Sequence, residues 1–547
     1  MEWSNFMVRR AAAFCLLAFS ASLSLAQWNP TGGQWGRTDS RDLRVMQWNV
    51  QDALCRTQPK VEGSNSWCAL AHIVAALKPD VLVIEEAGDN SGNGTGTGVD
   101  SQAQLTSVTQ MFIGGGTDTF LGGSVTSYVQ KYDATLSYPY IYVSNQTDNF
   151  NRNLIISRYP FTDLNGDGQS NLGNIVNASD LYAPGGGGGI RGFAFSEIDL
   201  PDASYRGNLV MGYAHLKSGG AASDLTERLT AGKNVAYIID YLFNGGGGST
   251  PNPRGRIITT ATSVLDAYTP VIWAGDFNED ENTNGRDGPV LWMTRAELAG
   301  GTDGTDRDRS DSAFDDARDP FNNSRVTQGS GKLDYICWQD SIATLRRSFI
   351  FNSASIGGNP APSELTSFGT VAVMSALAAD HRPVIADFIL PAPPPPAPGA
   401  FSLSLPSNGD SGLTTTPTLT WTASSGATSY TVKIAQNAAL SPPVLTQFGV
   451  TGTSFVIPAT VLDGCSTYYW GVTAVNANGS TASTPTSFSF LTRSVADYNG
   501  DGFLDFTDFD EFVTGFEAGD TAADFNADGF IDFTDFDGFV TAFEAGC

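Results

Sequence analysis

The chain has 547 residues, of which 41% are hydrophobic, and its formal net charge is −27. Such a length predicts several domains, and the ordinary apolar content excludes a disordered protein. Residues 27 to 393 carry 26 basic and 40 acidic side chains, which excludes a broad basic surface for nucleic acid, although a bound metal ion can supply positive charge locally.

The first 26 residues have the pattern of a secretory signal peptide. Arg9 and Arg10 precede a short apolar stretch over residues 11–25, and Ala26 ends a Ser-Leu-Ala cleavage pattern. We expect cleavage after residue 26 and a secreted or cell-surface protein. The alternative is an uncleaved anchor, but the stretch is short for a membrane span, and no later stretch looks transmembrane.

The cysteines are interpreted in the light of this expected export. Cys55 and Cys68 lie close together in the sequence, which suits a disulfide in an oxidising compartment. Cys337 lies in an apolar run and is expected to be buried. The pairing of Cys465 and Cys547 stays open.

Residues 41–390 alternate apolar strand-like runs with amphipathic helical stretches, which predicts an α/β or α+β domain. The expected strands are 43–48, 81–84, 154–156, 209–213, 271–273, 333–338 and 384–389. The expected helices are 69–77 and 225–242. Polar segments rich in Gly or Asp, at 88–125, 163–190 and 280–330, are expected to be long loops.

The remainder of the chain changes character twice. Residues 391–399 are rich in Pro and predict an extended linker. Residues 400–493 contain short alternating runs at 418–421, 430–434 and 468–475, which predict a small all-β, immunoglobulin-like sandwich. Residues 494–547 contain an internal repeat.

In that repeat, the twelve residues that begin at Asp497 return with few changes at Asp524. Oxygen donors occupy positions 1, 3, 5, 9 and 12 of each copy, with Gly at position 6, as in an EF-hand calcium loop. The expected Ca²⁺ ligands are Asp497, Asn499, Asp501, Asp505 and Asp508, and then Asp524, Asn526, Asp528, Asp532 and Asp535. The repeat therefore predicts a small α-helical, EF-hand-like calcium tail, and an unstructured acidic tail is the alternative.

A partial version of the same pattern occurs earlier in the chain. Asp163, Asn165 and Asp167 have the spacing of the first three calcium ligands, but the later positions are weak. A calcium site and a simple Gly-rich turn are both open there.

The chain contains three histidines, and two of them flank expected strands. His215 follows one strand and His381 precedes another, where an imidazole is well placed for acid–base work. His72 lies among apolar residues of an expected helix and is interpreted as structural.

Polar residues also gather at strand ends in this region. They are Asn49, Glu86, Asp276, Asn278 and Asp334. A carboxylate at a strand end is costly to bury unless it meets a metal, a partner charge or several donors. Five such residues in one domain favour a Mg²⁺ (or Mn²⁺) site over five independent strand caps.

The order of these motifs resembles the endonuclease/exonuclease/phosphatase superfamily over nearly all of residues 41–390. No single motif is decisive, and the specificity lies in the ordered set. The motifs are Gln47-Trp-Asn, Pro79-Asp-Val, Asn153-Leu-Ile-Ile-Ser-Arg-Tyr-Pro, His215-Leu-Lys-Ser, Gly275-Asp-Phe-Asn, Leu333-Asp-Tyr-Ile and Asp380-His-Arg-Pro-Val.

The resemblance implies a four-layered α/β sandwich with the site where strand ends meet. It implies that Glu86 is the principal metal ligand, supported by Asn49. Glu85 is the alternative ligand, and the spacing from the Pro-Asp-Val motif favours Glu86. Asp276 and Asn278 would orient the attacking water and the phosphate.

The same resemblance implies roles for the histidine motifs. His381 would bind the phosphate or transfer protons, Asp334 would hold its tautomer, and Asp380 would help the metal or the water. His215 matches a second histidine of the deoxyribonuclease-like and sphingomyelinase-like branches, and its carboxylate partner is not assigned.

The leading hypothesis is therefore a secreted, metal-dependent phosphodiesterase, a nuclease with DNA or RNA as substrate. The alternatives are a sphingomyelinase-like lipid phosphodiesterase, which should carry an exposed apolar hairpin, and a surface adhesion or scaffold protein with an inactive domain. Residues 400–493 resemble a type III fibronectin module, and residues 494–547 resemble a type I dockerin, which implies a cohesin-like or cell-surface acceptor.

Overall fold

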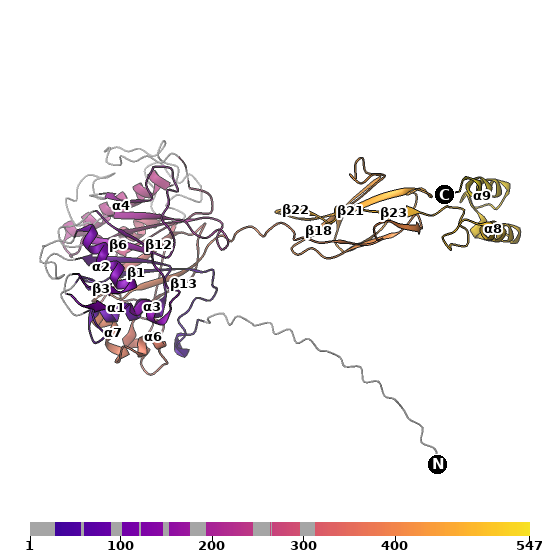
Figure 1. Cartoon of the computed structure of the whole chain (residues 1–547). Coiled ribbons are helices and arrows are strands. Elements are labelled where there is room, and N and C mark those ends of the chain that lie inside the picture. Colours follow the sequence, from indigo (N-terminus) through magenta and orange to yellow (C-terminus); the bar gives the residue numbers. More distant parts are fainter. Residues whose placement is uncertain are drawn as a thin grey trace, which may run out of the picture. The chain divides into compact units, whose positions relative to one another are not determined.

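The computed structural model describes residues 28–55, 60–88, 101–119, 122–145, 152–175, 193–243, 263, 265–295 and 312–546. The chain divides into two compact units, Met1–Pro393 and Pro394–Cys547 (Figure 1). The expected signal peptide lies outside the described residues. Among the helices of the described part, none is long and apolar enough to cross a membrane.

The first sheet of unit 1 has the strand order β13-β14-β1-β2-β6-β5. β1 is parallel to β2 and antiparallel to β14, so the carboxyl ends of β1 and β2 lie at the same edge of the sheet. The strands are β1 (Leu43–Asn49), β2 (Val81–Gly88), β5 (Tyr140–Val143), β6 (Arg152–Ser157), β13 (Thr344–Ile350) and β14 (Val384–Ile389).

The second sheet has the order β11-β12-β10-β9-β8-β7. Its central strands β9 and β10 are parallel, and β12 runs antiparallel to β10. The strands are β7 (Asn171–Ile175), β8 (Phe193–Ile198), β9 (Leu209–Ala214), β10 (Val271–Asp276), β11 (Ser312–Phe314) and β12 (Asp334–Gln339). All seven strands expected in this domain are present.

Side-chain alternation along these strands generates four layers. On β1, Val45 points into a core shared by the two sheets, whereas Met46 and Trp48 point into a second core beneath helices. On β10, Ile272 faces the shared core and Trp273 faces a third core, to which α4 contributes. Because each sheet is apolar on both faces, the two sheets pack together and helices cover their outer faces.

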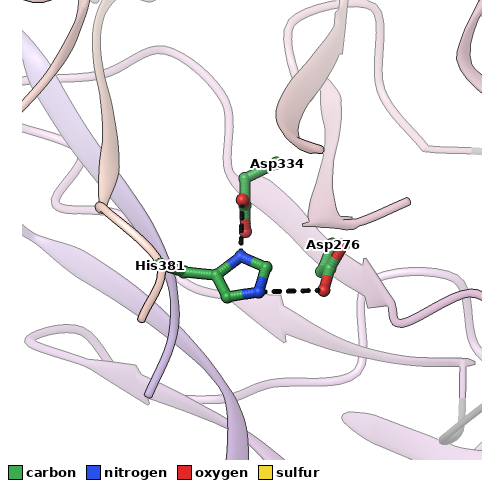
Figure 2. Close-up of side chains that lie close together, drawn as sticks. All are labelled: Asp276, Asp334 and His381. Carbon is green, nitrogen blue, oxygen red and sulfur yellow. Dashed lines mark hydrogen bonds and ion pairs between the residues drawn. The ribbon is translucent and has the colours of Figure 1, made fainter. Parts of the chain in front are cut away.

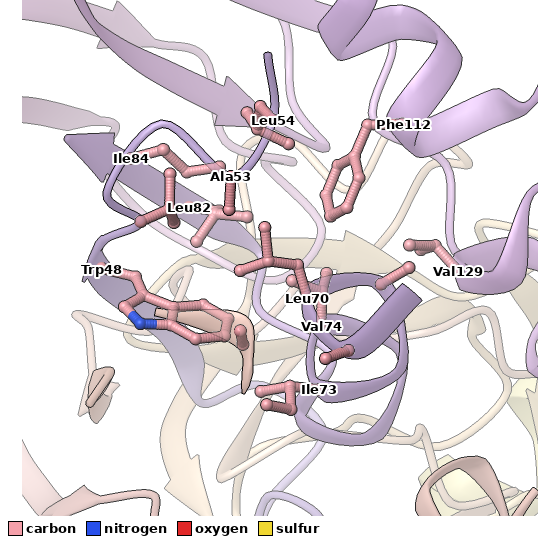
Figure 3. Packing of buried hydrophobic residues seen from close by; sticks show 14 of the residues in the cluster. Trp48, Ala53, Leu54, Leu70, Ile73, Val74, Leu82, Ile84, Phe112 and Val129 are labelled. Atoms are coloured by element: carbon pink, nitrogen blue, oxygen red, sulfur yellow. The ribbon is translucent and has the colours of Figure 1, made fainter. Parts of the chain in front are cut away.

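Helices from separate parts of the chain cover the first sheet. α1 is buried along its whole length, and Leu70, Ile73 and Val74 pack with Trp48 of β1 and Phe112 of α2 (Figure 3). The helices of this unit are η1 (Pro30–Gly32), α1 (Ser66–Leu77), α2 (Gln102–Gly114), α3 (Tyr128–Tyr132), α4 (Ala222–Phe243), α5 (Pro289–Arg295), η4 (Ser353–Ile356), α6 (Ser363–Thr366), η5 (Val371–Val373) and α7 (Met374–Ala378).

The expectation of three long loops is wrong in part. The 88–125 segment contains α2 and the short strands β3 (Gly116–Thr117) and β4 (Ser124–Val125). Ser101 and Gln104 form a capping box at the start of α2, a local signal that the Gly-rich composition of the segment concealed. The 163–190 segment contains β7, and the 280–330 segment contains α5 and β11.

The predicted Cys55–Cys68 disulfide is also wrong, because Cys68 is a free thiol. Both side chains are buried in the core beneath the helices, where cysteine packs as a small hydrophobic residue. Cys337 is buried, as expected. Cys465 takes part in a disulfide, which the sequence left open.

Unit 2 begins with an all-β sandwich. Leu419 and Trp421 from one sheet and Val432 and Trp470 from the other lie in a single apolar core. The sheet orders are β15-β17-β20 and β16-β23-β21-β18-β19, with β22 paired to β21. The strands are β15 (Leu403–Leu405), β16 (Asp410–Leu413), β17 (Thr418–Trp421), β18 (Ser429–Ala435), β19 (Leu445–Val450), β20 (Ser454–Val456), β21 (Thr467–Asn476), β22 (Gly479–Ala482) and β23 (Phe488–Thr492).

The tail contains two equivalent loop–helix repeats. α8 (Phe506–Ala518) and α9 (Phe533–Ala545) each follow one acidic loop, with η6 (Thr521–Ala523) between them. Phe512 of α8 and Phe539 of α9 stack with ring centroids 3.8 Å apart and are both fully buried. The two repeats therefore share one small aromatic core.

Candidate active site

The core between the two sheets changes from apolar to polar at one end. Odd-numbered residues of β1 face this layer, and after Leu43 and Val45 the next in the series are Gln47 and Asn49. The same alternation on β10 and β12 places Asp276 and Asp334 in the layer. The strand ends of both sheets therefore deliver their polar side chains to one buried location.

Glu85 and Glu86 occupy this region differently. Glu85 continues the alternation of β2 into the layer and is fully buried, and its Oε2 accepts the N–H of Asp276 at 2.7 Å. Glu86 has a φ of +51°, next to a register shift in the β2–β6 pairing. This departure from strand geometry lets Glu86 reach Asn49, whose Nδ2 donates to Glu86 Oε1 at 3.2 Å.

His381 is held by a carboxylate of the second sheet. Its Nδ1 lies 2.8 Å from Asp334 Oδ2, and the side chains are shown in Figure 2. Gln47 Nε2 donates to Asp334 Oδ1 at 3.0 Å, and Trp48 Nε1 donates to the His381 carbonyl at 3.0 Å. These contacts fix the imidazole so that Nε2 points toward Asp276 (Figure 2).

The charges around His381 shift its titration. Burial by itself lowers the pKa of the imidazole, but the neighbouring carboxylates, above all Asp334, raise the pKa of His381 to about 10. In the same pair, burial opposes ionisation of Asp334, but the contact with His381 gives this carboxyl a lowered pKa. The structure thus favours an imidazolium–carboxylate pair.

Asp276 is the centre of the cluster. Its Oδ2 lies 3.2 Å from Asn49 Nδ2, 3.4 Å from His215 Nε2 and 3.6 Å from His381 Nε2. Burial, with repulsion from Asp334, raises the pKa of Asp276 to about 7. Three nitrogen-bearing side chains therefore surround one carboxylate oxygen.

The second histidine is anchored by the loop after β10. His215 is 1% exposed, and its Nε2 also lies 3.7 Å from Glu86 Oε1. Asn278 has a φ of +54°, its N–H donates to Asp276 Oδ1 at 2.9 Å, and its Nδ2 donates to the Leu216 carbonyl at 3.1 Å. The carboxylates facing His215, which the motif order did not assign, are thus Asp276 and Glu86.

Asp380 differs from the other predicted residues. It is exposed, and the hydrogen bonds and ion pairs of the described residues do not join its side chain to the cluster. Its negative charge helps raise the pKa of His381. Conversely, Gln47 was named only within a motif and not as a site residue, and Glu85 was expected only as the alternative ligand. Strand alternation is the signal that could have placed both in the polar layer.

His72 is structural, as expected. It is fully buried in α1, its Nδ1 contacts the Glu364 carbonyl, and its ring stacks on Tyr128 with centroids 5.3 Å apart.

The tail repeats form two loops with similar hydrogen bonds, which differ in one acceptor contact of the first aspartate. In the first, Asp497 accepts the N–H groups of Gly500 and Gly502 at 2.9 and 3.1 Å. Asp508, at position 12, is fully buried and accepts the Asn499 N–H at 3.1 Å. In the second, Asp524 accepts the N–H groups of Asp528 and Gly529 at 3.1 and 2.8 Å, and Asp535 accepts that of Asn526 at 3.0 Å.

The remaining predicted tail ligands belong to the same loops. Asp501 follows Asn499, whose Oδ1 accepts its N–H at 2.9 Å. Asp505 and Asp532 are the N-caps of α8 and α9. The oxygen-only donor set suits Ca²⁺.

Comparison with known proteins gives similarity in arrangement only. No family model and no curated protein matches the chain. Similar solved structures include the human Nocturnin catalytic domain with bound sulfate, at 12% identity over 64% of this chain and 95% of that chain, with a TM-score of 0.34. An endonuclease/exonuclease/phosphatase family protein from Leptotrichia buccalis is 14% identical over 63% of this chain and 98% of that chain, with a TM-score of 0.35. Sphingomyelinase C from Streptomyces griseocarneus is 15% identical over 63% of this chain and 99% of that chain, with a TM-score of 0.33. Values this low leave activity to be argued from the residues themselves.

Proposed function

We propose that unit 1 is a metal-dependent phosphodiester hydrolase. The observation that carries the proposal is the convergence of two imidazoles and an amide on the buried Asp276 carboxylate. Phosphodiester hydrolysis needs an activated water, donors for the phosphoryl oxygens and a proton for the leaving group. This cluster supplies groups of all three kinds within one small volume.

The donor set fits a hard divalent cation at the rim of the cluster. Glu86 is the carboxylate with access to solvent, because its side chain is 17% exposed whereas that of Asp276 is 3% exposed. Glu86 and Asn49 would hold Mg²⁺ or Mn²⁺ there. When bound, the ion supplies positive charge to the phosphate and polarises it for attack.

The chain's own residues would divide the remaining work. Asp276, oriented by the Asn278 N–H, accepts the proton of the attacking water. His381, kept charged by Asp334, donates a hydrogen bond to a phosphoryl oxygen through Nε2. His215 follows the carboxyl end of β9 in the second sheet and delivers a proton to the leaving oxygen.

We infer that a nucleic acid, DNA or RNA, is the leading substrate class. The lipid alternative calls for an exposed apolar hairpin. The exposed large hydrophobic residues in the described part of unit 1 are Val61, Val373 and Ile389, which belong to three separate segments of the sequence. The scaffold alternative calls for an inactive site, which does not suit a complete cluster of acid, base and amide groups.

The tail is proposed to bind two Ca²⁺ and to dock the enzyme to a cohesin-like or cell-surface acceptor. Each repeat exposes two phenylalanines, Phe503 and Phe506 in the first and Phe530 and Phe533 in the second, each more than 70% exposed. Exposed aromatic side chains in equivalent positions favour a binding surface. We also propose that the signal peptide directs export and that the mature protein acts outside the cell. N-terminal sequencing of the protein from its native host tests this, and a mature chain that still begins at Met1 would contradict it.

A substrate panel tests the proposed function. Plasmid DNA, single-stranded DNA, RNA, sphingomyelin and inositol phosphates are incubated with the full chain and Mg²⁺, Mn²⁺ or chelator. The expected result is metal-dependent cleavage of nucleic acid that is lost in Asp276→Asn. Asp202 is an exposed aspartate outside the cluster, so the control variant Asp202→Asn should keep the activity. Cleavage of sphingomyelin alone would mean that the site acts on a lipid and not on nucleic acid. Inactivity on every phosphodiester would overturn the proposal.

A further inference from the structure

A loop of calcium-binding type lies in unit 1, outside the candidate active site. Residues 163–169 connect β6 to β7. Asp163 accepts the N–H groups of Gly166 and Gly168 at 2.8 and 2.9 Å. Asn165 Oδ1 accepts the N–H of Asp167 at 3.1 Å. Both glycines have positive φ, +71° and +83°, as a sharply turned loop requires.

The first tail repeat has the same hydrogen bonds at the same spacing. Asp497 accepts from Gly500 and Gly502, and Asn499 Oδ1 accepts the N–H of Asp501 at 2.9 Å. The chain thus contains this arrangement in unit 1 as well as in the tail. Loop geometry alone does not establish a cation site, but a buried side chain of a neighbouring strand also faces this loop.

That side chain belongs to Glu197 on β8. Its side chain is fully buried, and Oε1 has no hydrogen-bond partner among the described residues. Its Oε2 accepts the N–H of Leu164, so the carboxylate is directed at the loop. Asp163, Asp167 and Glu197 each place an oxygen within 4.8 Å of the other two.

Two other buried carboxylates of unit 1 have cationic partners. Asp387 pairs with Arg44, and Glu279 pairs with Arg228. Within the described part of the chain, no ion pair to Lys or Arg compensates Glu197, and burial raises the pKa of its carboxyl to about 8. Three converging carboxylates, one of them buried with an unpartnered oxygen, are costly without a cation.

We propose that this loop and β8 form a third calcium site, in which Asp163, Asp167 and Glu197 are the carboxylate ligands. In the tail loops, position 12 of the same segment supplies the closing carboxylate, whereas here Glu197 supplies it from a neighbouring strand. The flexible, oxygen-only donor set favours Ca²⁺ over Mg²⁺, which demands a stricter octahedral geometry.

The site is structural and does not take part in the chemistry. Glu197 pairs with Val210 at the start of β9, whereas His215 follows the end of that strand. The ion would fasten the 163–169 loop to the sheet, where the Thr162 N–H already donates to the Glu197 carbonyl at 3.0 Å. Its loss should therefore lower the stability of unit 1 and leave the reacting groups in place.

Calcium counting by equilibrium dialysis tests the proposal on the full chain. Asp497→Ala and Asp524→Ala are combined to disable the tail loops. This background is expected to retain one bound Ca²⁺, and the further change Glu197→Gln should abolish it. A background that binds no Ca²⁺, or a Glu197→Gln protein that still binds one, would overturn the proposal.

Thermal unfolding of unit 1 gives a second readout. With chelator, Glu197→Gln should melt at or above the temperature of its parent, because the substitution removes a buried carboxyl that has no cationic partner in the described part of the chain. With added Ca²⁺, the parent should gain stability and the variant should not. Asp163→Asn, at an exposed position, should also lose the gain, whereas the exposed control Asp202→Asn should keep it. Equal stabilisation of all four proteins by Ca²⁺ would contradict the site.

Discussion

The candidate active site and the calcium-type loops of the tail are both acidic, but they are built in opposite ways. In the active site, Gln47 reaches Asp334 across 287 positions of sequence, and Trp48 reaches the His381 backbone across 333. In the tail, Asp508 accepts the N–H of a residue nine positions away. Side chains from distant strands therefore surround the active-site carboxylates, whereas backbone N–H groups of one short segment surround those of the tail.

This difference teaches how each site should respond to perturbation. The candidate active site is positioned by three cores of hydrophobic side chains, so metal removal from this site should abolish activity and leave unit 1 folded. The tail has a small core around Phe512 and Phe539, so we expect its loops to depend on a bound ion for stability.

The largest expected effect comes from the two histidines of the active site. His381→Ala and His215→Ala should each reduce the rate by roughly a hundred- to ten-thousand-fold, since the first removes a charged donor to the phosphate and the second removes the proton donor to the leaving oxygen. Steady-state kinetics on the best substrate of the panel, with a melting curve for each variant, measures this. Wild-type rates in both variants would refute the mechanism, and loss in His381→Ala alone would leave His215 as a polar residue at a strand end.

The second largest effect is expected at Glu86, and it should distinguish this residue from the adjacent Glu85. Glu86→Gln should lower the rate and raise the metal concentration needed for half-maximal activity. Glu85→Gln should leave that concentration nearly unchanged, because burial raises the pKa of Glu85 well above its usual range, so a neutral amide is a close mimic. Metal titrations of both variants are the measurement. The reverse result would assign the metal to Glu85.

The third largest effect is expected in the tail, when calcium is removed. At a Ca²⁺ concentration about a hundred times the dissociation constant, one bound ion adds about 2.7 kcal/mol of stability. Circular dichroism and limited proteolysis of the full chain, with Ca²⁺ and with chelator, should show loss of helix and new cleavage within residues 494–547. Asp508→Ala and Asp535→Ala should resemble the chelated protein. Identical digestion patterns in both conditions would count against calcium-dependent folding of the tail.

The smallest effect on chemistry is expected at His72. Because this imidazole is buried against Tyr128 and bonded to a backbone carbonyl, His72→Ala should cost roughly 1–3 kcal/mol of stability. The rate per folded molecule should stay near wild type, as measured by activity below the melting temperature. A rate loss comparable to that of His381→Ala would mean that the third histidine also serves the reaction.

Local sequence patterns determined the positions of many strands, helices and loops of this protein. Apolar periodicity located all seven expected strands and both expected helices of unit 1, because alternation and helical spacing are properties of a few consecutive residues. The repeated spacing of donors from Asp497 and Asp524 likewise located two loops whose hydrogen bonds the structure shows. The capping box at Ser101 was equally local, but the Gly-rich composition around it led to the wrong expectation of a loop.

Tertiary structure alone decided which side chains meet. The positive φ of Glu86 turns it toward Asn49, while Glu85 follows the strand into the buried layer, and two adjacent identical residues carry no sequence signal for that difference. Spacing suggested a bond between Cys55 and Cys68, but packing buried them as parts of an apolar core. Glu197 lies beside the 163–169 loop because β8 pairs with β7 and β9 in the second sheet. Contacts between distant segments depend on strand register and layer packing, which short-range sequence patterns do not specify.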